Sequence, residues 1–154
     1  PVIAPNGLSY SFTENASPIQ ILQGLNVSDV DSTQLVGARV AITTGLQSGA
    51  DQLSFAAASG ISGSYDATSG VLSLSGTASL AAYQSVLRSV SFSNSSESPT
   101  TTARQITVTV TDNSGNSSTE TSAAISRTVT VAVNEDQPAF CFLSRALMSA
   151  ILRL

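Results

Sequence analysis

The chain has 154 residues, a formal net charge of −4, a single cysteine, and neither lysine nor histidine. This length suits one domain with its own core. The absence of lysine and histidine excludes Ser-His and Ser-Lys catalysis and a Lys-Asn crosslink. The single cysteine excludes an intrachain disulfide and, without histidine, a zinc site of Cys and His ligands. The acidic balance argues against a surface that binds nucleic acid.

The carboxylates are concentrated in the first part of the chain. Residues 1–137 carry four arginines against ten acidic residues. This surplus of oxygen ligands favours cation binding over internal salt bridges.

Alternating apolar and polar residues predict a β-rich fold. After a linker at residues 1–7, the first strand is expected to end at Glu14. Turn signals from Gly, Pro, Asn and Asp separate the later strands. The expected strands lie around 10–12, 19–21, 25–27, 38–42, 53–55, 72–74, 90–92, 106–110 and 129–133. Seven to nine short antiparallel strands indicate a β-sandwich, whose inward residues are Val40, Ile42, Leu72, Phe92, Ile106, Val108, Val110, Val129, Val131 and Val133.

One segment has helical spacing instead. Leu80, Tyr83, Leu87 and Val90 recur at intervals of three or four residues after Ser79, a good N-cap. We expect a short helix at 80–88 that packs one apolar stripe on the sandwich and holds no ligand.

Asp29-Val30-Asp31 follows the alternating run that ends at Val27. Two carboxylates one residue apart can converge on a hard cation such as Ca²⁺. The alternative is a polar turn whose side chains accept hydrogen bonds from nearby backbone amides.

Four acidic motifs follow one another at predicted strand ends: Glu14, Asp29-Val30-Asp31, Asp112, and Asn134-Glu135-Asp136-Gln137-Pro138. In this order they resemble the cadherin-like repeat. Residues 64–88 are especially similar to the tandem cadherin-like repeats of large bacterial surface and secreted adhesins. The resemblance covers residues 1 to about 140. It implies an all-β, cadherin-like (Ig-like) antiparallel β-sandwich at 8–133, with one short inserted helix and a linker motif at 134–139.

The resemblance also implies Ca²⁺ as the bound ion. Its ligands would be Glu14, Asp29, Asp31, Asp112, Asn134, Glu135 and Asp136. Ala132 replaces the leading acid of the linker motif, and the helix around Tyr83 replaces an acidic loop of animal cadherins, so we expect one or two ions per junction rather than three. An alternative for Asp112 is a turn that needs no metal.

The function implied is a non-enzymatic structural or adhesive repeat of a large extracellular protein, stiffened by Ca²⁺ at inter-repeat junctions. Its partners would be neighbouring repeats of the same chain and a cell-surface protein or glycan, not nucleic acid. The alternative is a ligand-binding β-sandwich such as a carbohydrate-binding module, which exposed aromatic clusters would favour. A carboxylate pair acting on a glycosidic bond is the remaining enzymatic possibility, but no aromatic platform accompanies these acids.

The two ends of the chain suggest a repeating unit. Pro1-Val2-Ile3 and Pro138-Ala139-Phe140 are similar, and their spacing gives a unit of about 137 residues. Residues 140–154 are apolar and helix-prone, but fall short of the roughly 20 residues that span a bilayer. They are interpreted as a truncated chain end, a packing helix or a membrane-surface anchor, in that order.

Overall fold

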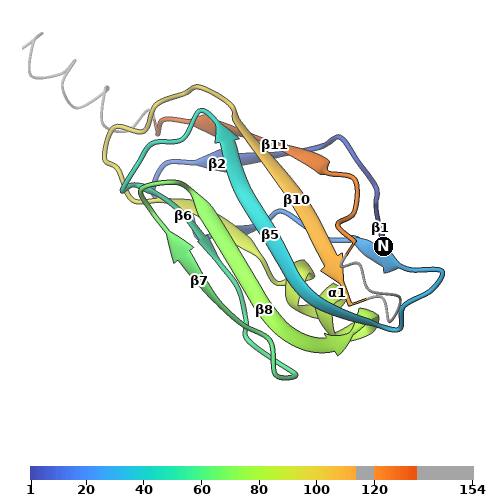
Figure 1. The fold of residues 1–154 in the computed structure, drawn as a ribbon. Coiled ribbons are helices and arrows are strands. Elements are labelled where there is room, and N and C mark those ends of the chain that lie inside the picture. The colour runs from blue at the N-terminus through green and yellow to red at the C-terminus, as the bar shows by residue number, and fades with distance from the viewer. Residues whose placement is uncertain (114–119, 135–154) are drawn as a thin grey trace, which may run out of the picture.

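The computed structural model describes residues 1–113 and 120–134. Within these residues, eleven strands and one helix surround a shared core (Figure 1). The elements are β1 (Val2–Ala4), β2 (Leu8–Thr13), β3 (Ile19–Gln20), β4 (Asn26–Ser28), β5 (Gln34–Thr44), β6 (Asp51–Ser54), β7 (Ser62–Asp66), β8 (Val71–Ser79), α1 (Leu80–Arg88), β9 (Ser91–Asn94), β10 (Arg104–Asp112) and β11 (Ile125–Ala132).

The strands form one large sheet and two small ones. The large sheet has the order β2-β11-β10-β5-β8-β7, the three-stranded sheet the order β3-β9-β6, and β1 pairs with β4. The rings of Phe12 on β2 and Phe92 on β9 meet edge to face, with centroids 5.4 Å apart. Because these rings come from different sheets, the large and the three-stranded sheet face each other across the core. The described part of the chain is therefore all-β with one short helix, in line with the sandwich expected from the alternation.

Strand β10 shows how the alternation builds the core. Its residues Ile106, Val108 and Val110 are fully buried, and they lie opposite Ile42, Val40 and Ala38 of β5. The intervening threonines lie on the outer face and are half-buried. Among the ten residues predicted to point inward, Val133 is the exception. It is 41% exposed because β11 ends one residue earlier, at Ala132.

Two pairings differ from the sequence-based expectation. Strand β2 runs parallel to β11, so the sandwich is not wholly antiparallel. Residues 2–4, expected to be part of a linker, form β1 and pair with β4, where Ile3 lies opposite Val27 and is buried. Both pairings join segments that are far apart in sequence or very short, so hydrophobic periodicity gives little signal for them.

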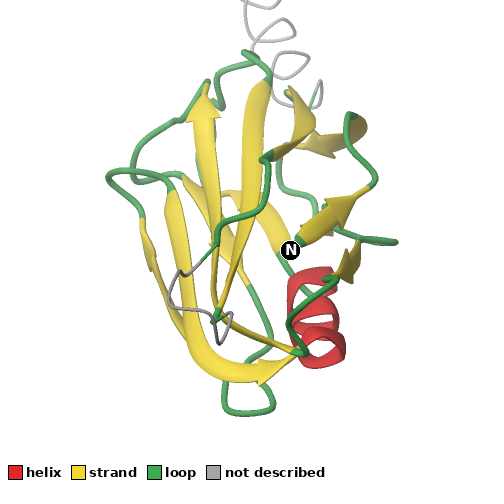
Figure 2. Cartoon of the chain, turned by 45° about the vertical axis from the view of Figure 1, so that its right-hand side comes forward, coloured by secondary structure: helices red, strands yellow, loops and turns green. Residues whose placement is uncertain are grey.

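The predicted helix is confirmed at 80–88. The Ser79 side chain caps it by accepting a hydrogen bond from the amide of Ala82 at 3.1 Å. Tyr83 is fully buried, and its hydroxyl donates to the carbonyl of Gly76 at 2.6 Å. Gly76 has φ +130°, and a Cβ there would collide with the carbonyl of Gly60. Figure 2 shows α1 beside the short strands near the N-terminus.

The strand directions separate the two ends of the large sheet. Strand β10 is antiparallel to β11, so Asp112, its last residue, lies at the end of the sheet where β11 begins. Strand β2 is parallel to β11, and Thr13 pairs with Ala132. Glu14 and Asn134 follow these two residues and therefore lie at the opposite end.

Candidate metal centre

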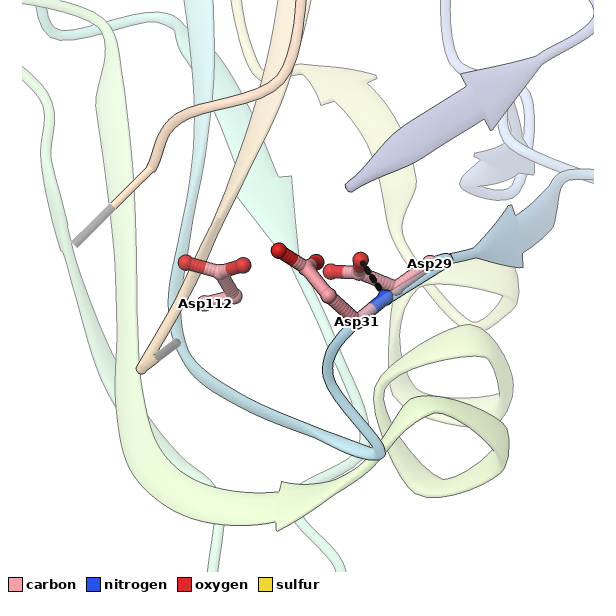
Figure 3. A group of neighbouring side chains, drawn as sticks. All are labelled: Asp29, Asp31 and Asp112. Atoms are coloured by element: carbon pink, nitrogen blue, oxygen red, sulfur yellow. Dashed lines mark hydrogen bonds between the residues drawn. The ribbon is translucent and has the colours of Figure 1, made fainter. Parts of the chain in front are cut away.

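Three of the predicted ligands converge at one end of the sheet. Carboxylate oxygens of Asp29, Asp31 and Asp112 lie within 4.8 Å of one another (Figure 3). Asp29 and Asp31 follow β4, and the next strand, β5, pairs with β10 so that Leu35 lies opposite Asp112. The β5–β10 pairing therefore brings together carboxylates that are about 80 residues apart in the sequence.

The loop after β4 is folded around one oxygen of Asp29. This Oδ1 atom accepts hydrogen bonds from the backbone amides of Asp31 at 3.2 Å and Ser32 at 3.4 Å. The other oxygen, Oδ2, lies 3.2 Å from the ammonium group of Pro1, and the Asp29 side chain is only 1% exposed. The turn interpretation is therefore correct for Oδ1, while Oδ2 makes its close contact with a cation.

Asp112 is held from the other side of the site. It is fully buried at the end of β10, and its Oδ1 atom accepts a hydrogen bond from the backbone amide of Glu120 at 2.8 Å. Asp31, by contrast, is exposed. The site therefore combines two carboxylates that are largely shielded from water with one that faces it.

The charges in this site affect one another's protonation. The pKa of Asp31 is raised by a hydrogen bond with the Asp29 side chain, by partial desolvation and by the negative charges of Asp29, Asp112 and Glu120. Burial acts to raise the pKa of Asp29. That effect is outweighed by hydrogen bonds with the Asp31 backbone and side chain and by the Pro1 ammonium, so its pKa lies well below the usual value. The cluster is thus strongly anionic, and a bound cation would relieve the repulsion.

Glu120 was not predicted from the sequence. Its charge acts on Asp31, and its backbone amide contacts Asp112. The chain returns to this place because Thr111 and Thr121 form an isolated β-bridge. The turn signal at Asp112 and Asn113 was visible in the sequence, but the returning segment is too short to show alternation.

A second group of predicted ligands lies at the opposite end. Glu14 is 4% exposed, and its Oε2 atom accepts a hydrogen bond from the backbone amide of Asn134 at 2.9 Å. Its Oε1 atom is buried and has no hydrogen-bond partner among the described residues. Glu135 and Asp136 lie outside the described residues. The structure thus divides those predicted ligands that it describes into two groups, one at each end of the large sheet.

Asp51 is an acidic residue that is already neutralised. Its carboxylate is fully buried with Arg104, whose Nε lies 3.0 Å from Oδ2. Asn94 donates to the other oxygen at 2.6 Å. Composition favoured cation binding over internal salt bridges, and this pair is a correction to that expectation. Asp51 therefore serves the core and is unavailable to an ion.

Exposed apolar side chains bear on the alternative of a carbohydrate-binding module. Among the described residues, the large hydrophobic side chains that are exposed are those of Val2, Leu8, Val30 and Val133. None is aromatic. The exposed aromatic cluster that would favour sugar binding is therefore not found in this part of the chain.

Comparison of the chain with protein-family models, with curated proteins and with solved structures gives no match. Separately, no helix in the described residues is both long enough and apolar enough to cross a membrane.

Proposed function

We propose that this chain is a non-enzymatic Ca²⁺-binding repeat of an extracellular protein, of the cadherin-like type that its acidic motifs resemble. The observation that carries the proposal is the convergence of Asp29, Asp31 and Asp112 within 4.8 Å. The extracellular setting and the adhesive role rest on the resemblance of the sequence motifs.

The chemistry of the three side chains fits a hard cation. All the side-chain atoms they offer are carboxylate oxygens, which Ca²⁺ prefers, and the group contains no His or Cys from the described residues. An ordinary Asx turn would use Oδ1 alone and would not require the partner carboxylate of Asp112.

The proposed role of the ion follows from the elements it would join. Asp29 and Asp31 belong to the loop after β4, whereas Asp112 belongs to a central strand of the large sheet. A cation shared by these carboxylates would tie the loop to the sheet and offset their mutual repulsion. Loss of the ion would leave the loop held by its hydrogen bonds alone.

Titration calorimetry with Ca²⁺ and Mg²⁺ tests the proposal. We expect a Ca²⁺ dissociation constant of about 10⁻⁴–10⁻³ M, the range of extracellular modules, and weaker Mg²⁺ binding because Mg²⁺ demands stricter octahedral geometry. Asp31→Asn should weaken Ca²⁺ binding by about tenfold or more, equivalent to about 1.4 kcal/mol. Glu97→Gln is the matched control, because Glu97 is exposed on the loop that precedes β10 and has the same charge. Equal Ca²⁺ affinities for Asp31→Asn and wild type would overturn the proposal.

A further inference from the structure

We propose that Gln84 and Arg88 of α1 are positioning residues for the Asp29, Asp31 and Asp112 site, an inference that rests on the proposed function. They hold β4, and with it the loop that carries Asp29 and Asp31, at the correct place relative to Asp112. The hydrogen bonds of Gln84 and Arg88 go to residues 25–27 rather than to the three carboxylates. Their effect on the ion is therefore indirect.

Side chains of α1 form hydrogen bonds with β4 and with the residue before it. The Gln84 side-chain oxygen accepts from the backbone amide of Val27 at 2.9 Å. Arg88 Nε donates to the carbonyl of Leu25 at 2.7 Å, and its Nη2 donates to the side chain of Asn26 at 2.9 Å. Residues four apart share one face of a helix. Both side chains therefore form hydrogen bonds with consecutive residues of one short segment, residues 25–27.

Besides these hydrogen bonds, the segment is held by burial of Leu25 in the core and by one short strand pairing. Among the described residues, β4 has three residues, lies outside the six-stranded and three-stranded sheets and pairs with β1 alone, which is equally short. An isolated pair of short strands is marginally stable by itself. Val27, the residue that Gln84 binds, precedes Asp29 by two residues. A strand rises only about 3.3 Å per residue, so the two residues leave little chain in which a displacement of β4 could be absorbed before it reaches Asp29.

The helix is a rigid support, and the other half of the site is fixed independently. Ser79 caps α1, and its residues Tyr83, Val86 and Leu87 are buried in the core. Asp112 ends β10, which pairs with strands on both sides within the large sheet. The distance between the two halves therefore depends on how α1 holds β4, and the hydrogen bonds of Gln84 and Arg88 set it.

Gln84→Met tests this inference, because methionine keeps the length of the side chain and removes the oxygen that accepts from Val27. We expect Ca²⁺ affinity to fall about tenfold, the low end of the effect of outer-shell partners on metal sites. With Tb³⁺ as a luminescent substitute for Ca²⁺, the lifetime of the bound ion should shorten, since water replaces a carboxylate that has moved away. Gln52→Met, on exposed Gln52 of β6, is the matched control and should change neither value.

A purely structural role would give a different result. Gln84→Met would then lower the melting temperature without changing the affinity or the Tb³⁺ lifetime, and that outcome overturns the inference. Gln84→Glu keeps an accepting oxygen and should restore the wild-type lifetime. Arg88→Lys keeps the charge but loses the pair of hydrogen bonds to Leu25 and Asn26, and should shorten the lifetime as Gln84→Met does.

If wild type binds neither ion, the proposed function and the inference are both wrong. If wild type binds and the α1 variants match it, only the inference falls.

Discussion

Tyr65 shows how a single partly buried contact makes stability depend on pH. Its hydroxyl donates to the backbone carbonyl of Asp51 at 2.8 Å. Burial and the nearby negative charges of Asp51 and Asp66 raise the pKa of Tyr65 from 10.0 to about 12. The folded protein therefore holds the phenol proton more tightly than the unfolded chain does. The resulting stabilisation is complete below pH 10 and is lost as the pH rises towards about 12.

We expect Tyr65→Phe to remove this part of the alkaline destabilisation. Wild type should lose stability more steeply than the variant as the pH rises through that window, and tyrosinate absorbance should show one phenol that ionises late. Denaturant unfolding at a series of alkaline pH values measures the difference. Parallel pH profiles for the two proteins would contradict the raised pKa.

The arginines illustrate what residue types alone could not predict. Arg104 and Arg127 both lie fully buried. Arg104 pairs with Asp51 and also donates to the carbonyls of Thr100 and Thr102. The contact with Asp51 joins segments that meet only in the folded sandwich, whereas the contacts with Thr100 and Thr102 are local in the sequence. Sequence patterns indicate which face a residue occupies, but not which residue from a distant part of the chain contacts it there.

At the scale of elements, hydrophobic periodicity predicted most of the strands, and the helix, that form the core. The alternation in β5, β10 and β11 and the helical spacing in α1 each extend over several residues, and the structure agrees with them. Strand β1 and the parallel pairing of β2 with β11 were not predicted, because both depend on contacts rather than on local pattern. The same reason explains the candidate site. The Asp29 and Asp31 pair was visible as a motif, whereas Glu120 and the contacts from Gln84 and Arg88 depend on the tertiary arrangement.

The buried face of α1 should contribute measurably to stability. Tyr83 is fully buried, and its ring and its hydrogen bond to Gly76 are both lost in Tyr83→Ala. We expect the free energy of unfolding to fall by about 3–5 kcal/mol, as it does when a buried aromatic residue is truncated. Tyr83→Phe keeps the ring and should cost only about 1 kcal/mol, the net value of one hydrogen bond. Denaturant unfolding measures both, and a loss within error for Tyr83→Ala would show that the helix is peripheral.

At the scale of the whole molecule, the two groups of predicted ligands lie too far apart to share an ion within one chain. Asp29, Asp31 and Asp112 occupy one end of the large sheet, and Glu14 with Asn134 occupies the other. In a head-to-tail array, the end of one copy that carries Asp29, Asp31 and Asp112 would face the end of the preceding copy that carries Glu14 and Asn134. Glu14 Oε1, buried and without a hydrogen-bond partner among the described residues, would then be directed towards a junction. We therefore expect an isolated chain to hold incomplete sites.

A tandem protein should therefore respond to Ca²⁺ more strongly than the single chain. We consider two copies of residues 1–137 joined directly, the second followed by the rest of the chain. Free Ca²⁺ at about 100 times the dissociation constant should stabilise a site found only in the folded state by roughly 2.7 kcal/mol. Melting temperature and small-angle X-ray scattering, each measured with Ca²⁺ and with a chelator, should show a more stable and more extended particle with the ion.

The position of Asp31→Asn within this tandem protein identifies the junction. In the second copy, Asp29 and Asp31 would lie next to Glu14 and Asn134 of the first copy, so the variant there should abolish the Ca²⁺-dependent extension. In the first copy, the same substitution lies at the free end of the molecule and should leave the extension intact while removing one weak site. Because the two proteins have identical composition and charge, any difference between them comes from the place of the carboxylate. If both variants respond to Ca²⁺ alike, the three aspartates act within each copy alone and the ion does not stiffen the junction.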